Sequence, residues 1–231
     1  MIEIIATSPN DAKIIEKCGA DRIELISAFS EGGLTPSRRI IESTLKITNI
    51  PVNIMIRPHA KSFVYTEKEI KAMKIDILTV KKLGANGVVI GVLNDQNEIC
   101  ESRLNELLTV CKGLEVTFHR AFDNLENKDK GIKVLSKYPQ ITTVLTSGGR
   151  GNITDNIPTL KKLIQESKHI KIMVGGGLNF DNINRIIKET RGREFHFGTA
   201  VRYQKSPFAN INEEKLKRLI NLVNNLIFNN Q

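Results

Sequence analysis

Short apolar runs alternate with longer amphipathic segments eight times along this chain of 231 residues. Each run is rich in valine and isoleucine and is bounded by glycine, proline, asparagine or aspartate, as buried parallel strands are. The predicted strands are Ile2–Ala6, Arg22–Leu25, Val52–Arg57, Gly87–Gly91, Glu115–His119, Thr142–Thr146, Lys171–Val174 and Glu194–Phe197. Eight such repeats in a chain of this length predict an α/β fold, a (β/α)8 TIM barrel that forms a single domain over residues 1–231.

The segments between the predicted strands have the spacing and the end signals of helices. Ile70, Met73 and Ile77 recur three or four residues apart, which predicts one buried helical face. Thr66, followed three residues later by Glu69, predicts a capping box at the start of that helix. An open, doubly wound sheet is the alternative, but it needs fewer strands. The asparagine-rich tail is expected to fray, at Asn224, Asn225, Asn229, Asn230 and Gln231.

The charge of the chain favours a small anionic partner over a nucleic acid. The net charge is +9, from 34 Lys and Arg against 25 Asp and Glu, and the lysines are spread along the predicted helices. Nucleic-acid binders usually gather basic residues on one element and interleave them with aromatic residues. Aromatic residues make up only 5% of this chain, and tryptophan is absent. We therefore expect a solvated basic surface that attracts small anions, and no nucleic-acid partner.

The apolar runs and the cysteines indicate a cytoplasmic protein. No run approaches the roughly 18 consecutive apolar residues of a membrane span, so we expect no membrane partner. The chain begins with an apolar strand and has none of the pattern of a signal peptide. Cys18, Cys100 and Cys111 form no CxxC pair and lie in no metal-ligand spacing. We expect them to be free, buried thiols in a reducing compartment.

Polar residues follow or interrupt several strands where a barrel of this type carries its function, at the carboxyl ends. Glu24 lies in the second strand, Arg57 and His119 end the third and fifth, Asp123 follows the fifth, and His196 lies in the eighth. A charge inside the barrel is costly unless it is paired. Since strands two and three are neighbours, we expect Glu24 to pair with Arg57.

The convergence of these residues in one layer predicts an acid–base site. His119, with an unperturbed pKa near neutrality, is the predicted proton-transfer residue, with Glu24 and His196 as further catalytic groups. Arg57 would hold an anion, and Asp123 would support the site from behind. Two structural interpretations remain open. The Glu24–Arg57 pair can simply hold the barrel together, and His119 can be a hydrogen-bonded core histidine.

Glycine-rich loops follow the last three strands and suggest a second part of the site. Loops after strands seven and eight often bind phosphate in these barrels, because glycines let backbone N–H groups approach an anion. Tight turns are the alternative explanation, and Arg150 could act as a mobile anion clamp. The predicted substrate-binding residues are Arg57, Asp123, Thr146, Ser147, Gly148, Gly176 and Gly177.

Two long loops are expected to fold over the barrel mouth. They span residues Ser27–Ser37 and Pro58–Thr66, and the second carries the aromatic residue Phe63. In the first loop we expect Thr35 to cap the next helix, with Pro36 in its first turn.

Six segments together resemble the CutC family, which is named for copper homeostasis. They are Asp21–Leu25, Glu31–Ser37, Ile56–Pro58, Gly91–Leu93, Thr117–Asp123 and Leu145–Gly148. The resemblance implies a cytoplasmic TIM barrel that forms a homodimer or a higher homo-oligomer. It also implies a role in copper tolerance or copper binding, with copper as a possible ligand. It does not define a biochemical activity.

One departure from the family pattern bears on copper. Many members have a cysteine just after the Glu-Leu of strand two, whereas this chain has Ile26 and Ser27. Cuprous copper prefers thiolate and thioether ligands. A copper site here would have to use His59, His119 or His196, with Glu24, and the sequence assigns no metal ligands. Two hypotheses follow: a copper-handling protein, or an enzyme acting on a small anionic, possibly phosphorylated, metabolite with indirect effects on copper.

Overall fold

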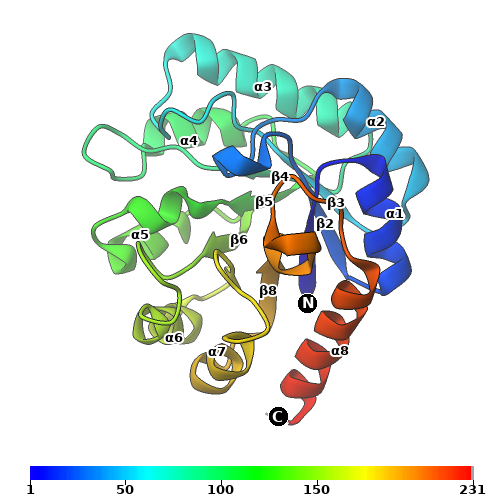
Figure 1. Cartoon of the computed structure of the whole chain (residues 1–231). Helices are drawn as coiled ribbons and strands as arrows, with labels where there is room; N and C mark the ends of the chain where they lie inside the picture. The colour runs from blue at the N-terminus through cyan, green and yellow to red at the C-terminus, as the bar shows by residue number, and fades with distance from the viewer. Residues whose placement is uncertain (230–231) are drawn as a thin grey trace.

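The computed structural model describes residues 1–229 and contains a closed barrel of eight parallel strands. The strands pair in chain order, and β8 pairs with β1 to close the barrel (Figure 1). The predicted (β/α)8 barrel is confirmed. The strands are β1 (Ile2–Ala6), β2 (Arg22–Leu25), β3 (Val52–Met55), β4 (Gly87–Ile90), β5 (Glu115–Phe118), β6 (Ile141–Thr146), β7 (Lys171–Val174) and β8 (Glu194–Phe197).

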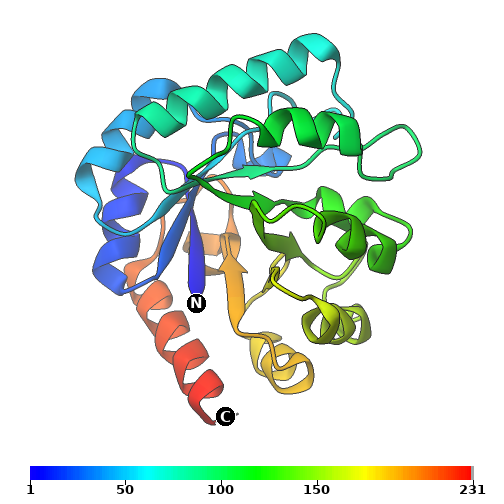
Figure 2. The same cartoon turned by 180° about the vertical axis from the view of Figure 1, so that it is seen from behind.

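A helix follows each strand, and the helices surround the barrel (Figures 1 and 2). The last helix packs between α1 and α7. No helix in the described part of the chain is long and apolar enough to cross a bilayer. The helices are α1 (Pro9–Cys18), α2 (Arg38–Ile47), α3 (Glu67–Lys82), α4 (Glu101–Leu108), α5 (Lys128–Leu135), α6 (Ile157–Glu166), α7 (Ile183–Thr190) and α8 (Glu213–Asn229).

Some predicted ends of helices and strands agree with the structure, and others differ from it. The capping box of α3 is present in both directions between Thr66 and Glu69. Strands β3 and β5 end one or two residues earlier than predicted, so Arg57 and His119 are loop residues. Arg57 precedes Pro58, which has no N–H to continue a ladder. His119 is the N-cap of the short 3-10 helix η2 (Arg120–Asn124).

One prediction about an element end is wrong. Helix α2 is capped by Ser37 and not by Thr35, because the Thr35 hydroxyl accepts a hydrogen bond from the backbone N–H of Arg57 instead. Asn224, Asn225 and Asn229, where fraying is expected, are residues of α8. Residues 230 and 231, which shared that prediction, lie outside the described residues.

The apolar core has two parts. The larger part lies between the barrel and its helices, and the smaller consists of Ile5, Ile26, Met55 and Val89 with Phe29 against them. Side chains alternate across a strand, and the other face of the strands carries buried polar and charged residues. These are Glu3, Arg22, Glu24, Asn53, Thr117, Thr143 and His196. The part of the barrel interior beneath the mouth is therefore polar, and it provides charged residues of the candidate functional site.

Candidate functional site

A cavity of about 500 Å³ lies at the mouth of the barrel and brings most of the predicted site residues together. It is formed where loops follow the strands. The predicted residues in its wall are Glu24, Arg57, His119, Asp123, Gly176, Gly177 and His196. Thr146, Ser147 and Gly148 are not part of the wall; they lie buried behind it, where Thr146 and Ser147 bond to Asp123.

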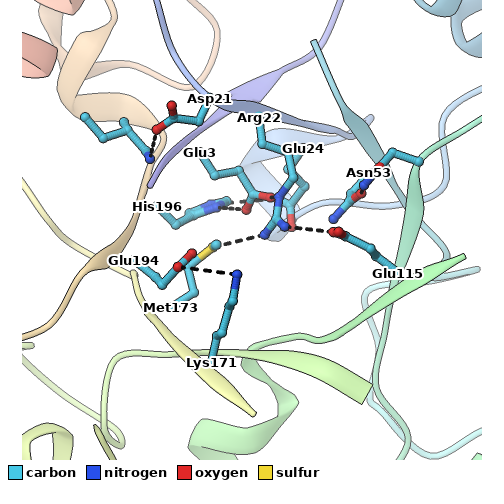
Figure 3. A network of polar contacts seen from close by, with 12 residues as sticks. Glu3, Asp21, Arg22, Glu24, Asn53, Glu115, Lys171, Met173, Glu194 and His196 are labelled. Carbon is cyan, nitrogen blue, oxygen red and sulfur yellow. Dashed lines mark hydrogen bonds and ion pairs between the residues drawn. The ribbon is translucent and has the colours of Figure 1, made fainter. Parts of the chain in front are cut away.

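The base of the cavity holds a buried histidine between two carboxyl groups (Figure 3). The Nδ1 atom of His196 lies 2.7 Å from Glu3 Oε1, and its Nε2 atom lies 3.8 Å from Glu24 Oε2. The registers explain this meeting, because Glu3 pairs with His196 across β1 and β8, while Ile5 pairs with Glu24 across β1 and β2. Glu3 was not predicted as a site residue.

The two carboxyl groups of this cluster have opposite pKa shifts. Burial works to raise the pKa of Glu3, but the charges of Arg22 and His196 outweigh it and bring the pKa to about 2. Burial also raises the pKa of Glu24, to about 7, and the nearby negative charge of Glu3 adds to the rise. Burial disfavours the charged form of His196, yet Glu24 and Glu3 together raise the pKa of its imidazole. Glu24 therefore titrates near neutrality, and the pKa of His196 lies above its ordinary value.

Arg22 balances the charge below this cluster. Its Nε donates to Glu3 Oε2 at 2.6 Å, and its Nη1 donates to Glu115 at 3.0 Å (Figure 3). The Glu3 carboxylate is almost fully buried, whereas the side chain of Glu115 is 46% exposed. Glu3 thus stays ionised and holds the ring orientation of His196, which leaves Nε2 facing Glu24.

The predicted Glu24–Arg57 pair does not form, and the prediction that all the charged groups share one layer is wrong. Glu24 is in register with Asn53 on β3, and Arg57 follows Asn53 by four residues. Four residues of extended chain span roughly 13 Å. Arg57 instead donates to the backbone carbonyls of Glu31 at 2.9 Å and Gly33 at 3.2 Å. This buried guanidinium has no carboxylate partner among the ion pairs of residues 1–229.

His119 lies near Arg57, at the upper part of the wall. The ring of Phe63 lies between them, 4.7 Å from the Arg57 guanidinium carbon and 5.0 Å from the His119 ring centre. Burial and the positive charges of Arg57 and Arg120 lower the pKa of His119 to about 3. The imidazole of His119 is therefore neutral at neutral pH, which favours a role as a hydrogen-bond partner over the predicted proton transfer. The expectation of a pKa near 6.5 ignored burial.

Asp123 organises the side of the cavity below the loop after β6. Its carboxylate accepts hydrogen bonds from the Thr146 hydroxyl and from the backbone N–H and hydroxyl of Ser147. It also accepts from Arg120 Nε at 2.8 Å. This carboxylate fixes the Arg120 side chain against Gly176, where an added Cβ would lie 2.6 Å from the guanidinium carbon.

Gly176 and Gly177 both lie in the left-handed backbone region, which fits either a tight turn or the predicted approach to an anion. Their φ angles are +92° and +101°, a region in which only glycine is comfortable. Arg150, the expected anion clamp, is exposed and also lines the cavity. Arg120, Arg150 and the turn at Gly176 and Gly177 therefore all line the rim of the cavity.

Three residues of the site were missed from the sequence, and each carried a signal. Glu3 and Arg22 are charged residues within strands that are otherwise buried, the same signal that identified Glu24. Arg120 stands beside His119 in the run from Thr117 to Asp123, but its contact with Asp123 depends on the turn of η2.

Glu3, Glu24 and His196 also have the donor types of a metal site. One ligand atom from each lies within 4.8 Å of the others, and all three residues are buried. Carboxylate and imidazole suit harder divalent ions, whereas cuprous copper prefers sulfur. Near the cluster, the Met173 sulfur is 3.8 Å from Arg22 Nη2. The three cysteines are free, and burial raises the pKa of Cys18 and of Cys111, that of Cys111 to about 12.

Three residues of the cavity wall each have a buried polar atom without a hydrogen-bond partner in the described protein. They are Glu24 Oε1, Arg57 Nε and His119 Nε2. An unpaired buried polar atom costs about 1–3 kcal/mol. These three polar atoms are therefore free to bond to a ligand in the cavity, because no other described residue bonds to them.

Comparison with known proteins finds a matching family model and similar curated proteins. The model of the CutC family matches residues 1–201. The copper homeostasis protein cutC homolog of Homo sapiens is 38% identical over 197 residues, covering 85% of this chain and 72% of that protein. The family protein CutC of Histophilus somni is 38% identical over 206 residues, covering 89% and 84%.

Solved structures agree with this assignment. The crystal structure of CutC from Streptococcus agalactiae has a TM-score of 0.80 and 32% sequence identity, and the match covers 86% of this chain and 97% of that one. The N-(5'-phosphoribosyl)anthranilate isomerase of Pyrococcus furiosus matches with a TM-score of 0.65 at 15% identity, covering 97% and 98%, which is a likeness of fold alone.

Proposed function

This chain belongs to the CutC family, and from that premise we propose that it serves copper homeostasis as an enzyme that moves a proton on a small anionic metabolite. Its effect on copper is then indirect. The metabolite binds in the cavity at the barrel mouth, with Arg57 holding the anion and the Glu24–His196 pair transferring the proton. Gly176 and Gly177 support the bound anion at the rim, and Asp123 acts through Arg120, whose side chain it orients.

The observation that carries the proposal is the set of unpaired polar atoms on Glu24, Arg57 and His119. A buried guanidinium without a carboxylate partner is an unfavourable arrangement unless an anion completes it. Arginine suits this role because its planar fork matches carboxylate or phosphate. The same cavity then presents a ligand anion to a carboxyl group that titrates near neutrality, as a general acid or base must.

The surroundings of Glu24 support the proposed proton transfer. The neighbouring Nε2 of His196 lies 3.8 Å away, and Glu3 holds the opposite nitrogen of that ring. A small movement of Glu24 brings the two groups into hydrogen-bond contact, so that the pair can exchange a proton. Groups with a pKa close to the working pH are the most effective proton carriers.

Unbiased ligand identification tests this proposal. Wild-type protein, Arg57→Met and the control Arg38→Met are dialysed against a small-molecule extract, and bound compounds are identified by mass spectrometry. Arg38 is an exposed residue that pairs with Glu42 on α2. We expect an anion to be enriched by the wild type and by Arg38→Met but not by Arg57→Met. Enrichment of no anion, or equal enrichment by all three proteins, would show that the proposal is wrong.

Direct copper binding is the second candidate, and the Glu3–Glu24–His196 group is the observation that favours it. These oxygen and nitrogen donors suit Cu(II) better than Cu(I). The candidate is weaker because Glu3 already bonds to Arg22 and to His196 Nδ1. Copper would have to displace those contacts.

We further propose a cytoplasmic location and self-association as a homodimer or a higher oligomer. Free cysteines persist in reducing compartments. On α3, Ile75 and Leu78 are 64% and 42% exposed and lie three residues apart, so they form an apolar patch on one helix face. Sedimentation at tens of micromolar, a concentration suited to weak association, tests this proposal. A purely monomeric protein there would contradict it.

A further inference from the structure

The protonation state of His119 can be assigned from its contacts. His119 is the N-cap of η2, and its Nδ1 accepts a hydrogen bond from the backbone N–H of Ala121 at 3.1 Å. A backbone N–H only donates, so Nδ1 carries no proton. A neutral imidazole has one N–H, and in His119 it must therefore be on Nε2. This tautomer follows from the position of one backbone donor.

The ring of His119 is held in this orientation. A Cβ added at Gly91 would lie 2.3 Å from its Cε1 and Nδ1 atoms, so glycine is required on that side. The rings of Phe63 and Phe118 lie 5.0 Å and 6.1 Å from its centre. The charged neighbours that affect it are Arg57 and Arg120, both positive, and they oppose a second proton.

We propose that His119 is a neutral N–H donor whose Nε2 binds a carbonyl oxygen of the ligand, so that the ligand is a small carbonyl-containing anion. Nε2 is buried in the cavity wall and has no partner in the described protein. The ligand must therefore supply an acceptor. A neutral imidazole can polarise a carbonyl without giving up its proton. The inference rests on the proposed function and specifies its substrate class.

Because Glu24 lines the same cavity, the proposal extends to a reaction class, proton transfer at the carbon next to the carbonyl of a ligand that reaches both residues. Ionised Glu24 removes a proton from that carbon, and the electrons of the broken C–H bond form a C=C bond. The carbonyl π electrons move to oxygen, and the enolate oxygen is stabilised by the Nε2–H of His119 and by the positive charge of Arg57. The proton then returns from Glu24 to carbon. Atoms and charge balance, and no oxidant is required.

The tautomer is tested first, on the wild-type protein. Nitrogen-15 NMR of the histidine side chains distinguishes protonated from unprotonated ring nitrogens. We expect His119 to carry its proton on Nε2 and to show no titration between pH 5 and pH 8. Titration in that range, or a proton on Nδ1, would overturn the assignment. This measurement needs no variant and no ligand.

The substrate class is tested with a matched pair of probes, 2-oxoglutarate and glutarate, which differ by one carbonyl oxygen. Calorimetry gives the affinity of each for wild type, His119→Gln and His119→Leu. We expect wild type to prefer 2-oxoglutarate by about tenfold, the scale of one hydrogen bond to a buried donor. His119→Gln, which keeps an N–H donor, should retain part of the preference, and His119→Leu should lose it.

The outcomes separate this inference from the proposed function. Equal binding of both probes by wild type, or an unchanged preference in His119→Leu, overturns the role of His119 while the anion site stands. Failure of wild type to bind either probe overturns the anion site and this inference together.

Discussion

Glu24 lies against His196, with Oε2 3.8 Å from Nε2, and this contact replaces the pairing with Arg57 that the order of the strands suggested. The base of the cavity therefore holds Glu24, whose pKa is raised to about 7, and His196, whose pKa is also raised. The upper wall holds the Arg57 guanidinium and the neutral imidazole of His119. Proton transfer and anion binding are thus assigned to different levels of the same cavity.

The first prediction concerns the pH dependence of stability. Glu24 has its pKa raised from 4.5 to about 7 in the folded protein. Between these values the folded state keeps a proton that the unfolded state has lost, so the contribution of Glu24 to stability is greatest below pH 4.5 and falls as pH rises to 7. The loss is about 3 kcal/mol, at about 1.4 kcal/mol per pH unit. The raised pKa of His196 acts in the same direction above pH 6.5.

Glu24→Gln should remove the Glu24 part of this dependence. Urea denaturation of wild type and Glu24→Gln at pH 5 and pH 8 measures it. Relative to wild type, the variant should gain stability at pH 8, whereas the exposed-site control Glu126→Gln should follow wild type. Parallel wild-type and Glu24→Gln profiles would contradict the raised pKa.

A second prediction compares the two carboxylates that bind Arg22. Glu3→Gln should destabilise the protein by roughly 3–5 kcal/mol, because it leaves a buried guanidinium without its main partner. Glu115→Gln removes the half-exposed partner and should cost less than about 1 kcal/mol. Chemical denaturation of both variants gives the comparison. Similar costs would mean that burial does not decide the strength of these pairs.

A third prediction tests the separation of Glu24 from Arg57. Arg57→Met removes donors to the carbonyls of Glu31 and Gly33 and should cost roughly 1–3 kcal/mol. Because Arg57 does not pair with Glu24, the double variant with Glu24→Gln should be additive within about 0.5 kcal/mol. A double-mutant cycle by urea denaturation measures this. A coupling of several kcal/mol would restore the ion pair predicted from the sequence.

Asp123 is the subject of a fourth prediction. Arg120, Thr146 and Ser147 donate hydrogen bonds to the two carboxylate oxygens of Asp123. Asp123→Asn leaves only one oxygen to accept them, because the amide NH2 group replaces the other. We expect a loss of about 3 kcal/mol, since a buried charged acceptor is removed. Inorganic phosphate should also bind more weakly, because Arg120 loses its orientation. Calorimetry measures the stability and the phosphate affinity of Asp123→Asn and of the exposed-site control Asp155→Asn. Equal losses in the control would show that the effects do not come from this site.

The fifth prediction concerns cuprous copper. Burial raises the pKa of Cys18 and Cys111, so neither thiol readily gives the thiolate that binds Cu(I). Competition against a strong Cu(I) chelator should give weak affinity that is unchanged when Cys18, Cys100 and Cys111 are all replaced by serine. Tight one-to-one binding by wild type that disappears in the triple variant would contradict this prediction.

The sequence by itself determined the barrel and many of the residues at its mouth. Eight apolar runs with helical segments between them leave few other folds, since each run must be buried on both faces. Strand position also places Glu24, Arg57, His119 and His196 near the carboxyl ends, because that depends on residues close together in the chain. Those predictions needed no knowledge of how the strands align.

Only the tertiary structure decided which of these residues meet and how they ionise. The register of Glu24 with Asn53 leaves Arg57 four residues further along the strand direction, and strand order does not reveal a register. Glu3 reaches His196 only because the first and last strands close the barrel. Burial then separates the pKa of Glu24, about 7, from that of His119, about 3. Those values depend on surroundings built from distant parts of the chain, which local sequence patterns do not contain.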